Sequence, residues 1–214
     1  MELIVFEGES MHSYFIRVLL CKGSINNLGA LNGLVSPSGA VGILPKLDKK
    51  VSSSFDYISD HLFKTLLLEH TAFNELGYFD LEEMKNYVLL GGSPADYGDG
   101  LHKIYGGKTQ LRYCPECFKV QIKEYGVCWF RLDWLCSLRC KLHNSPLYHV
   151  RSRRLDCCEK PSNINRNLQA AMTGKCTFCG KCTWSNPNEI YIGDHNRHQY
   201  ILFNKKELHD RVWL

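Results

Sequence analysis

The amino-acid sequence predicts an α+β fold, in which a helical N-terminal domain with a helix-turn-helix-like start precedes two small metal-binding modules. Three observations lead to this prediction. Apolar residues recur at helical spacing in the first half of the chain. Ten of the 11 cysteines follow residue 113 and mostly form closely spaced pairs. Between the halves, residues 91–110 contain six glycines, which makes this stretch the best candidate for a domain boundary.

The first helix is expected after Ser10, which can cap the segment MHSYFIRVLLC, and Gly23 stands where such a helix should stop. Ser24 can cap a second short helix over 25–34. Two short helices joined by a tight turn resemble a helix-turn-helix, although most helical hairpins bind nothing. Residues 35–50 are rich in Gly, Pro and Ser and are expected to form a loop.

Two further helices complete the first half. One is expected near Phe55–Phe73, and the other at Leu81–Leu90, where Asp80 can cap the helix. Near the end of the chain, EIYIG and QYILF flank a turn and predict a hairpin, before a last helix over 205–214. The expected units are therefore a helical domain at 1–110, a first module at 111–155 and a second module at 156–214.

Composition narrows the class of protein. Apolar residues make up 44% of the chain, enough for a packed core, yet no run approaches the ~20 residues of a membrane span. The start MELIVFEGES lacks the basic leader and long apolar core of a signal peptide, so we expect a cytoplasmic protein without membrane contact. Clustered cysteines in a reducing compartment favour metal over disulfides, and the odd number of cysteines disfavours a secreted disulfide scaffold.

Charge is distributed unevenly. Residues 1–110 carry nine Lys and Arg against 13 Asp and Glu, whereas residues 111–214 carry 17 against nine. This division suggests different partners for the two halves. The basic half suits the phosphates of DNA or RNA, but solvated lysines that keep a domain soluble would give the same count.

The first module has the ligand pattern of a structural zinc site. Cys114 and Cys117 form a Cys-x-x-Cys pair, and Cys140 and His143 form a Cys-x-x-His pair. Four such ligands complete a tetrahedral zinc ion and leave no open position, which indicates a structural rather than a catalytic ion. Binding would also supply folding free energy that a small core lacks.

A second zinc ion is expected in the second module. Cys176 and Cys179 precede a glycine in a Cys-x-x-Cys-Gly turn, and Cys157 and Cys158 lie upstream. Adjacent cysteines rarely both ligate one ion, so Cys157 competes with Cys182 for the fourth position. His195 or His198 is a further candidate for a ligand of this ion.

Aromatic and basic residues lie between and after the first ligand pairs. Trp134 and its aromatic neighbours could stack on bases, but packing in a small core is the favoured interpretation. Cys128 and Cys136 are expected to be buried small hydrophobic residues. The cluster Arg151, Arg153 and Arg154 could bind phosphate or form a solvated face.

Together these residues resemble the TniQ family, which includes TnsD-like target selectors of transposons. The opening Glu9-Ser10-x-x-Ser13-x-x-x-Arg17 is similar to the family's N-terminal helix motif. The finger is similar in its Cys-Pro-x-Cys pair, its aromatic–Arg–x–x–Trp segment, its Cys-x-x-His pair and a following leucine, here Cys114, Pro115, Cys117, Phe130, Arg131, Trp134, Cys140, His143 and Leu147. The resemblance covers roughly residues 4–182.

The resemblance implies a non-catalytic adaptor in DNA transposition. With 214 residues the chain resembles the short members, including those of CRISPR-associated transposons, which link an RNA-guided effector of the Cascade type or another CRISPR effector to the transposon's AAA+ ATPase regulator. It further implies contact with DNA or guide RNA and a homodimer in effector-bound forms. Arg17, Arg131, Trp134 and the Arg151–Arg154 cluster are the candidate partner-binding residues.

Two alternatives compete with the adaptor. A free-standing zinc-containing protein that binds a specific DNA sequence would use the helix pair near residues 10–34, although the acidic balance of the first half disfavours it. A metal-dependent nuclease would use Asp194, His195 and His198. Its histidine motif would then lie outside the cysteine pairs, in the wrong order, so we expect no enzymatic activity.

Overall fold

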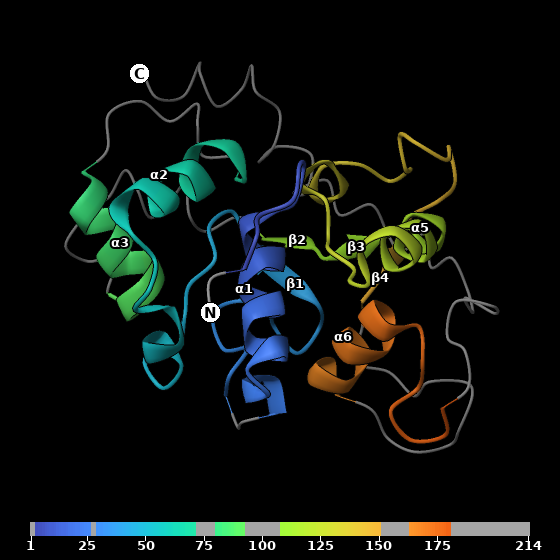
Figure 1. Ribbon diagram of the computed structural model, residues 1–214, viewed down its shortest axis with the longest axis horizontal. Helices are drawn as coiled ribbons and strands as arrows, with labels where there is room; N and C mark the ends of the chain where they lie inside the picture. Colours follow the sequence, from blue (N-terminus) through green and yellow to red (C-terminus); the bar gives the residue numbers. More distant parts are fainter. Residues whose placement is uncertain (1–2, 27–28, 72–79, 93–107, 151–162, 181–214) are drawn as a thin grey trace.

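The computed structural model describes residues 3–26, 29–71, 80–92, 108–150 and 163–180 (Figure 1). Within these ranges the chain forms five α-helices, three short 3-10 helices and two antiparallel sheets of two strands each. The predicted α+β class is therefore confirmed. The expected C-terminal hairpin and last helix lie outside the described residues.

Helix α1 (Met11–Cys21) is the central element, with α2 and α3 on one side of it and α5 on the other (Figure 1). It begins as predicted, because the Ser10 side chain accepts a hydrogen bond from the Ser13 amide at 3.2 Å. It ends at Lys22, and the next residue, Gly23, has a positive φ of 68° that suits glycine. Nine consecutive residues from Met11 to Leu19 are buried, so the helix is enclosed on all sides rather than amphipathic.

The prediction of a second helix at 25–34, which would complete a helix-turn-helix, is wrong for the described residues of that segment. Ser24 begins only a 3-10 turn, η1 (Ser24–Asn26), and residues 29–34 form turns. Helix α6 (Ile164–Thr173) packs against this turn instead: the Asn165 amide donates to the Ile25 carbonyl, and Gln169 donates to Asn26 at 2.7 Å. Tertiary contacts from 140 residues away thus stabilise an irregular segment.

The next helices agree more closely with the sequence. Helix α2 (Asp60–Glu69) is shorter than expected because Ser59 caps it and a separate 3-10 turn, η2 (Ser52–Phe55), precedes it. Helix α3 (Leu81–Leu90) has the predicted bounds, with the Asp80 side chain accepting from the Glu83 amide at 3.0 Å.

The first sheet uses segments that the sequence presented as loop or boundary, and the second lies within the first module. Strand β1 (Ala40–Gly42) pairs with β2 (Lys108–Gln110), and β3 (Arg112–Tyr113) pairs with β4 (Tyr148–His149). With two or three residues each, these strands are too short to show an alternating pattern.

The finger region consists of helix α5 (Pro115–Tyr125) and the 3-10 turn η5 (Leu132–Leu135). Its buried side chains join those of the first half in one hydrophobic cluster, which extends from Met11 to Met172. A separate helical N-terminal domain is therefore not confirmed, and the limits at 1–110, 111–155 and 156–214 stay a prediction.

Candidate metal centre

The first ligand pair lies at the N-terminus of α5. Cys114 is the residue before the helix, Pro115 occupies its first turn, and Cys117 follows one turn later. Proline is favoured there because the first helical amides have no partner within the helix. The positive end of the helix dipole also favours negative charge on both cysteine sulfurs.

The second pair lies in a tight loop. The Cys140 amide donates to the Ser145 carbonyl and the Asn144 amide donates back to the Cys140 carbonyl, each at 2.8 Å. Asn144 has a φ of 50°, a left-handed conformation that asparagine tolerates well. The loop thereby presents Cys140 and His143 to the helix, and it also places the Ser145 hydroxyl 3.5 Å from the Cys114 sulfur. The sequence pattern gave no signal for Ser145.

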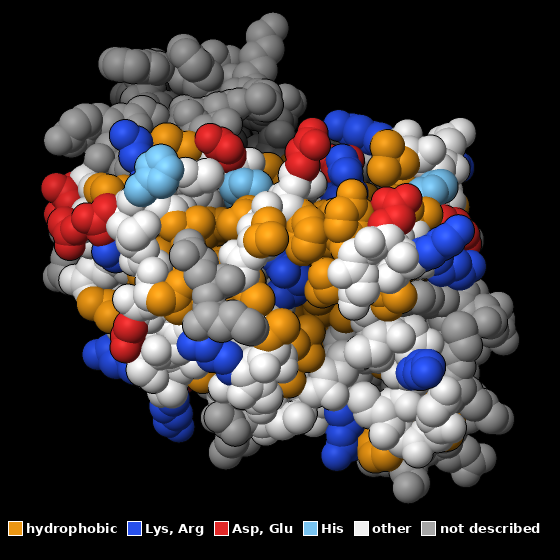
Figure 2. All heavy atoms as spheres, in the orientation of Figure 1, with side chains coloured by type: hydrophobic (Ala, Val, Ile, Leu, Met, Phe, Trp, Pro, Cys, Tyr) orange, Lys and Arg blue, Asp and Glu red, His pale blue; other side chains and the backbone are white. Residues whose placement is uncertain are grey.

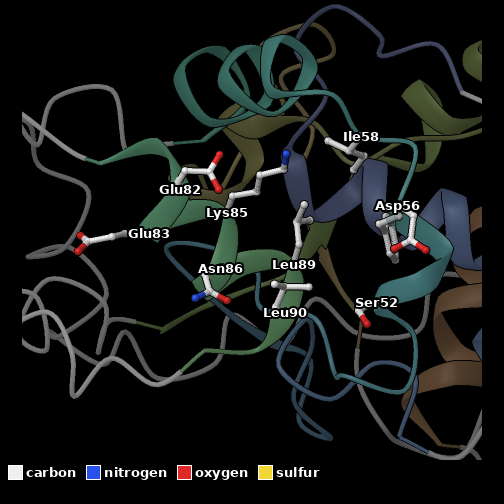
Figure 3. A pocket seen from close by; sticks show the side chains of 10 residues that line it. Ser52, Asp56, Ile58, Glu82, Glu83, Lys85, Asn86, Leu89 and Leu90 are labelled. Carbon is white, nitrogen blue, oxygen red and sulfur yellow. The ribbon is translucent and has the colours of Figure 1, made fainter.

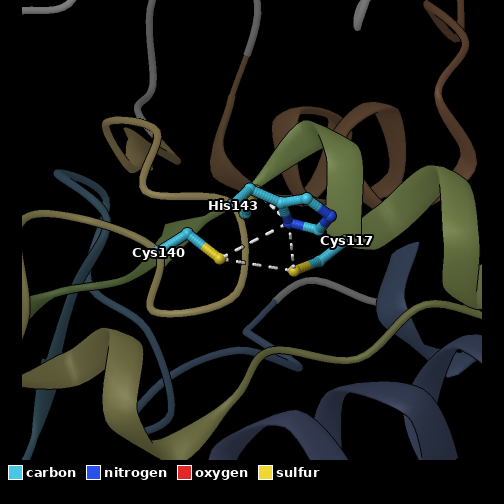
Figure 4. Close-up of side chains that lie close together, drawn as sticks. Cys117, Cys140 and His143 are labelled. Carbon is cyan, nitrogen blue, oxygen red and sulfur yellow. Dashed lines mark hydrogen bonds between the residues drawn. The ribbon is translucent and has the colours of Figure 1, made fainter.

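The structure brings all four predicted ligands together, with every ligand atom within 4.8 Å of the others. His143 Nδ1 lies 3.3 Å from Cys117 Sγ and 3.6 Å from Cys140 Sγ, and the two sulfurs are 3.5 Å apart (Figure 4). The Cys114 sulfur, which Figure 4 does not draw, lies 3.6 Å from the same nitrogen. Ordinary zinc bond lengths in a tetrahedron give about 3.8 Å between sulfurs and about 3.5 Å from sulfur to nitrogen. The cluster therefore fits one tetrahedral metal ion.

The ligands differ in exposure and in acidity. The three cysteines are buried, whereas His143 is exposed. Hydrogen bonding from Cys117 is the main cause that lowers the pKa of the Cys114 thiol to about 4, and the same interaction raises the pKa of Cys117. Cys128 serves as a contrast, because burial alone raises the pKa of its thiol to about 12. Anionic sulfur is thus favoured at Cys114 and disfavoured at Cys117 and at Cys128.

The second expected ligand set can be followed only in part. Cys176 and Cys179 form a turn in which the Phe178 amide lies 3.4 Å from the Cys176 sulfur and Gly180 has a φ of 70°. Such an amide-to-sulfur contact is typical of a cysteine knuckle. Cys157, Cys158, Cys182, His195 and His198 lie outside the described residues. Among the residues that are described, the first cluster alone gathers three or more metal-binding side chains.

The Glu-Ser-x-x-Ser-x-x-x-Arg motif forms a buried hydrogen-bond network. Arg17 donates to both oxygens of the Glu9 carboxylate at 2.7 Å, and the Ser13 hydroxyl and the Phe6 amide donate to the same carboxylate at 2.9 and 3.2 Å. Glu9 is 0% exposed and Arg17 is 4% exposed. Four donors match the roughly four lone pairs of a carboxylate, so this buried charge is fully satisfied.

The same network ties α1 to the finger and to α2. Ser13 Oγ accepts from the Phe130 amide at 2.8 Å, and the Ser10 amide donates to the Phe130 carbonyl at 2.9 Å. On the other side, the His70 ring donates through Nδ1 to the Glu9 carbonyl at 2.6 Å. The motif thus joins three segments that lie far apart in the sequence.

Most of the candidate partner-binding residues that are described lie inside the protein. Arg17 is enclosed in the network, and Trp134 is fully buried and packs on Phe118, with ring centroids 5.7 Å apart. The packing interpretation of Trp134 is therefore confirmed. Arg131 is partly exposed and donates to Asp133 at 2.9 Å.

The remaining predicted residues give mixed results. Arg151, Arg153 and Arg154 lie outside the described residues. Cys128 is buried as expected, but the prediction for Cys136 is wrong because this cysteine is exposed. Cys136 follows the 3-10 turn η5, which directs the neighbouring Trp134 and Leu135 inward and leaves the next position at the surface.

No family model, curated protein or solved structure matches this chain. Among the helices of the described residues, none combines the length and the apolarity needed to cross a membrane.

Proposed function

We propose that this chain is a non-catalytic adaptor in DNA transposition, which links a targeting complex to the transposon's AAA+ ATPase regulator. The observation that carries the proposal is the network of Glu9, Ser13 and Arg17 with the Phe130 amide. Ser13 belongs to the segment that resembles the N-terminal TniQ motif, and Phe130 belongs to the segment that resembles the TniQ finger. These two residues are 117 positions apart in the sequence, yet they form a hydrogen bond. Contact between the two motifs supports the view that they belong together.

Zinc is the metal that we assign to the first cluster. Three thiolates and one imidazole suit zinc and soft metals, and a set closed by four protein ligands suits a structural ion. The ligand atoms all lie within 4.8 Å of one another and so enclose one ion, whereas an iron–sulfur cluster spreads its ligands over two or more irons. A second zinc ion at Cys176 and Cys179, with Cys158 and either Cys157 or Cys182, remains part of the proposal.

Metal analysis of the purified protein tests the zinc assignment. We expect two zinc ions per chain, and we expect Cys117→Ser to lose one of them because it removes a buried ligand. Cys136→Ser is the matched control, since Cys136 is an exposed cysteine outside the cluster and its loss should leave the zinc content unchanged. Iron in place of zinc, or equal zinc in both variants, would contradict the assignment.

A binding assay tests the adaptor role. The zinc-loaded chain should retain the AAA+ ATPase encoded with it, and an RNA-guided effector of the same system, on an affinity resin. The N-terminal half of the chain is acidic and the C-terminal half is basic. These opposite charges would orient such a complex and raise its association rate more than its affinity. Failure of the zinc-loaded chain to retain either protein would contradict the adaptor proposal.

The alternative of a free-standing DNA-binding protein receives less support. It would use a helix pair near residues 10–34, but the described residues of the second segment, 25–26 and 29–34, form η1 and turns. Sequence-selective DNA binding by the chain alone, measured over a range of salt concentrations, would favour this alternative over the adaptor.

A further inference from the structure

A groove lies between α3 and the segment that precedes α2, on the opposite side of α1 from α5 (Figures 1 and 3). Its volume is about 480 Å³. One wall comes from α3 and the other from η2 and the residues that follow it. The lining residues are Ser52, Phe55, Asp56, Ile58, Glu82, Glu83, Lys85, Asn86, Leu89 and Leu90.

The groove has an apolar floor and an acidic rim. Phe55, Ile58 and Leu89 are at most 6% exposed and form the floor, while Leu90 is an exposed hydrophobic side chain, at 52%. An aliphatic residue that is half exposed beside an apolar floor offers area that a partner could bury. The polar residues stand at the edge and do not converge on the floor, unlike those of a small-molecule site.

Charge at the rim favours a cationic partner. The lining contains three carboxylates, of Asp56, Glu82 and Glu83, against the single ammonium of Lys85. Lys85 pairs with Asp60 of α2, so its charge is already balanced. Glu82 and Asp56 are exposed on opposite walls, whereas Glu83 points away (Figure 3). The space-filling view shows acidic side chains gathered at the edge of the molecule where α3 lies (Figure 2).

We propose that this groove binds a basic amphipathic helix of a partner protein. Leucine-like residues of that helix would cover Leu90 and the floor, and its Lys or Arg residues would face Asp56 and Glu82. This is the helix-in-groove mode of recognition, in which apolar anchors supply affinity and rim charges set orientation. The proposal goes beyond the adaptor role, because it concerns a face away from the metal centre and does not depend on transposition.

Two synthetic peptides serve as probes, each about four helical turns long. The first places leucines on one face and lysines elsewhere, and the second has the same composition with the leucines distributed around the helix. With the zinc-loaded chain, we expect the first peptide to shift backbone amide resonances of residues 52–58 and 82–90 and to bind at least about tenfold more tightly than the second.

Substitutions then separate charge from apolar contact. Asp56→Lys with Glu82→Lys should weaken binding of the first peptide by about tenfold or more, as should Leu90→Asp. Glu7→Lys with Glu124→Lys is the matched control, because it reverses two exposed carboxylates outside the groove and should change affinity little. All substituted side chains are exposed, and thermal unfolding identifies any variant that is misfolded and must be replaced by Leu90→Ser or Glu82→Gln.

Three outcomes would overturn the proposal: resonance shifts that map outside the groove, equal affinity for the two peptides, or equal effects of the groove and control charge reversals. A peptide that binds without these signatures would show only general attraction to an acidic protein. The adaptor assay with the ATPase and effector is independent of this result, so failure of one proposal can be told from failure of the other.

Discussion

At the scale of single residues, the cysteine and histidine spacing predicted which four side chains come together, since a Cys-x-x-Cys turn carries its geometry locally. The same reasoning could not place Arg17. An arginine on a helix is usually exposed, whereas this one contacts the Glu9 carboxylate, the Ile4 carbonyl and the Phe6 ring, all of which lie before the helix. The charge of Arg17 therefore stabilises the fold instead of a partner complex.

Breaking this ion pair should be costly. Glu9→Gln leaves the buried Arg17 guanidinium without its counter-charge, so we expect a loss of about 3–5 kcal/mol in the free energy of unfolding. Asp60→Asn breaks the exposed Lys85–Asp60 pair and should cost less than about 1 kcal/mol. Urea unfolding of both variants measures the difference, and equal costs would show that the buried network contributes little.

His12 should make stability depend on pH. Burial lowers the pKa of this histidine to about 3, whereas an unfolded histidine has a pKa of about 6.5. Below pH 6.5 the unfolded chain therefore binds a proton that the folded chain excludes, and stability falls by about 1.4 kcal/mol per pH unit until the pH approaches 3. The contribution is fully present above the unfolded pKa.

The variant His12→Leu isolates this effect. It removes the titrating ring but keeps the metal ligands, so any pH dependence that the ligands cause is common to both proteins. We expect the wild-type chain to lose stability more steeply than His12→Leu between pH 6 and 4, as measured by denaturant unfolding. Parallel curves would contradict the assignment of a buried, neutral His12.

At the scale of elements, one glycine joins the two sheets. Gly39 precedes β1, its carbonyl accepts from the Leu111 amide at 2.8 Å, and its φ is 82°. A Cβ atom at this position would lie 1.7 Å from the Val150 carbonyl oxygen, which no small shift can relieve. The close approach of two backbones requires glycine here.

A pair of alanine substitutions tests this close contact. Gly126→Ala, at a φ of 73° with nothing within 4 Å of the added Cβ, should cost only the conformational strain of about 1–2 kcal/mol. Gly39→Ala should cost that strain plus about 1–3 kcal/mol or more from overpacking. Denaturant midpoints give both values, and similar losses would mean that β1 and β4 can move apart.

Elements with a local signal were predictable, and those held by distant contacts were not. Ser10 and Asp80 predict the starts of α1 and α3, because a capping side chain acts on its own helix. The 25–34 segment carries apolar residues at helix-like spacing. Gly29 and Gly33 nevertheless adopt φ of 85° and 79°, and α6 binds the 3-10 turn η1 at the start of the segment. Strand β2 was unpredictable because its partner, β1, lies about 70 residues earlier.

At the scale of the whole molecule, the finger and α1 share one core. Ser10 and Ser13 bond to Phe130, and the ring of Phe130 packs on Phe118 of α5, 5.3 Å between centroids. Phe118 follows the ligand Cys117 directly. The sequence predicted separate modules because cysteine spacing reports the metal site but not which surface the finger packs against.

Removal of the metal should therefore lower the local stability of α1. Chelation frees the two ends of the finger, so we expect the amides of Met11–Leu19 to lose protection from hydrogen exchange. Helix α3, on the far side of α1, should lose less and serves as the internal reference (Figure 1). Unchanged protection in α1 after complete metal loss would show that finger and helix are stable independently.

The central claim, an adaptor that selects targets for transposition, is tested most directly by a transposition reaction with and without this chain. The reaction contains the transposase, the AAA+ ATPase and the targeting effector encoded with it. We predict that omitting the chain, or supplying Cys117→Ser in its place, abolishes insertion at the selected target, while Cys136→Ser supports it. Targeted insertion that continues at the same frequency without the chain would contradict the account.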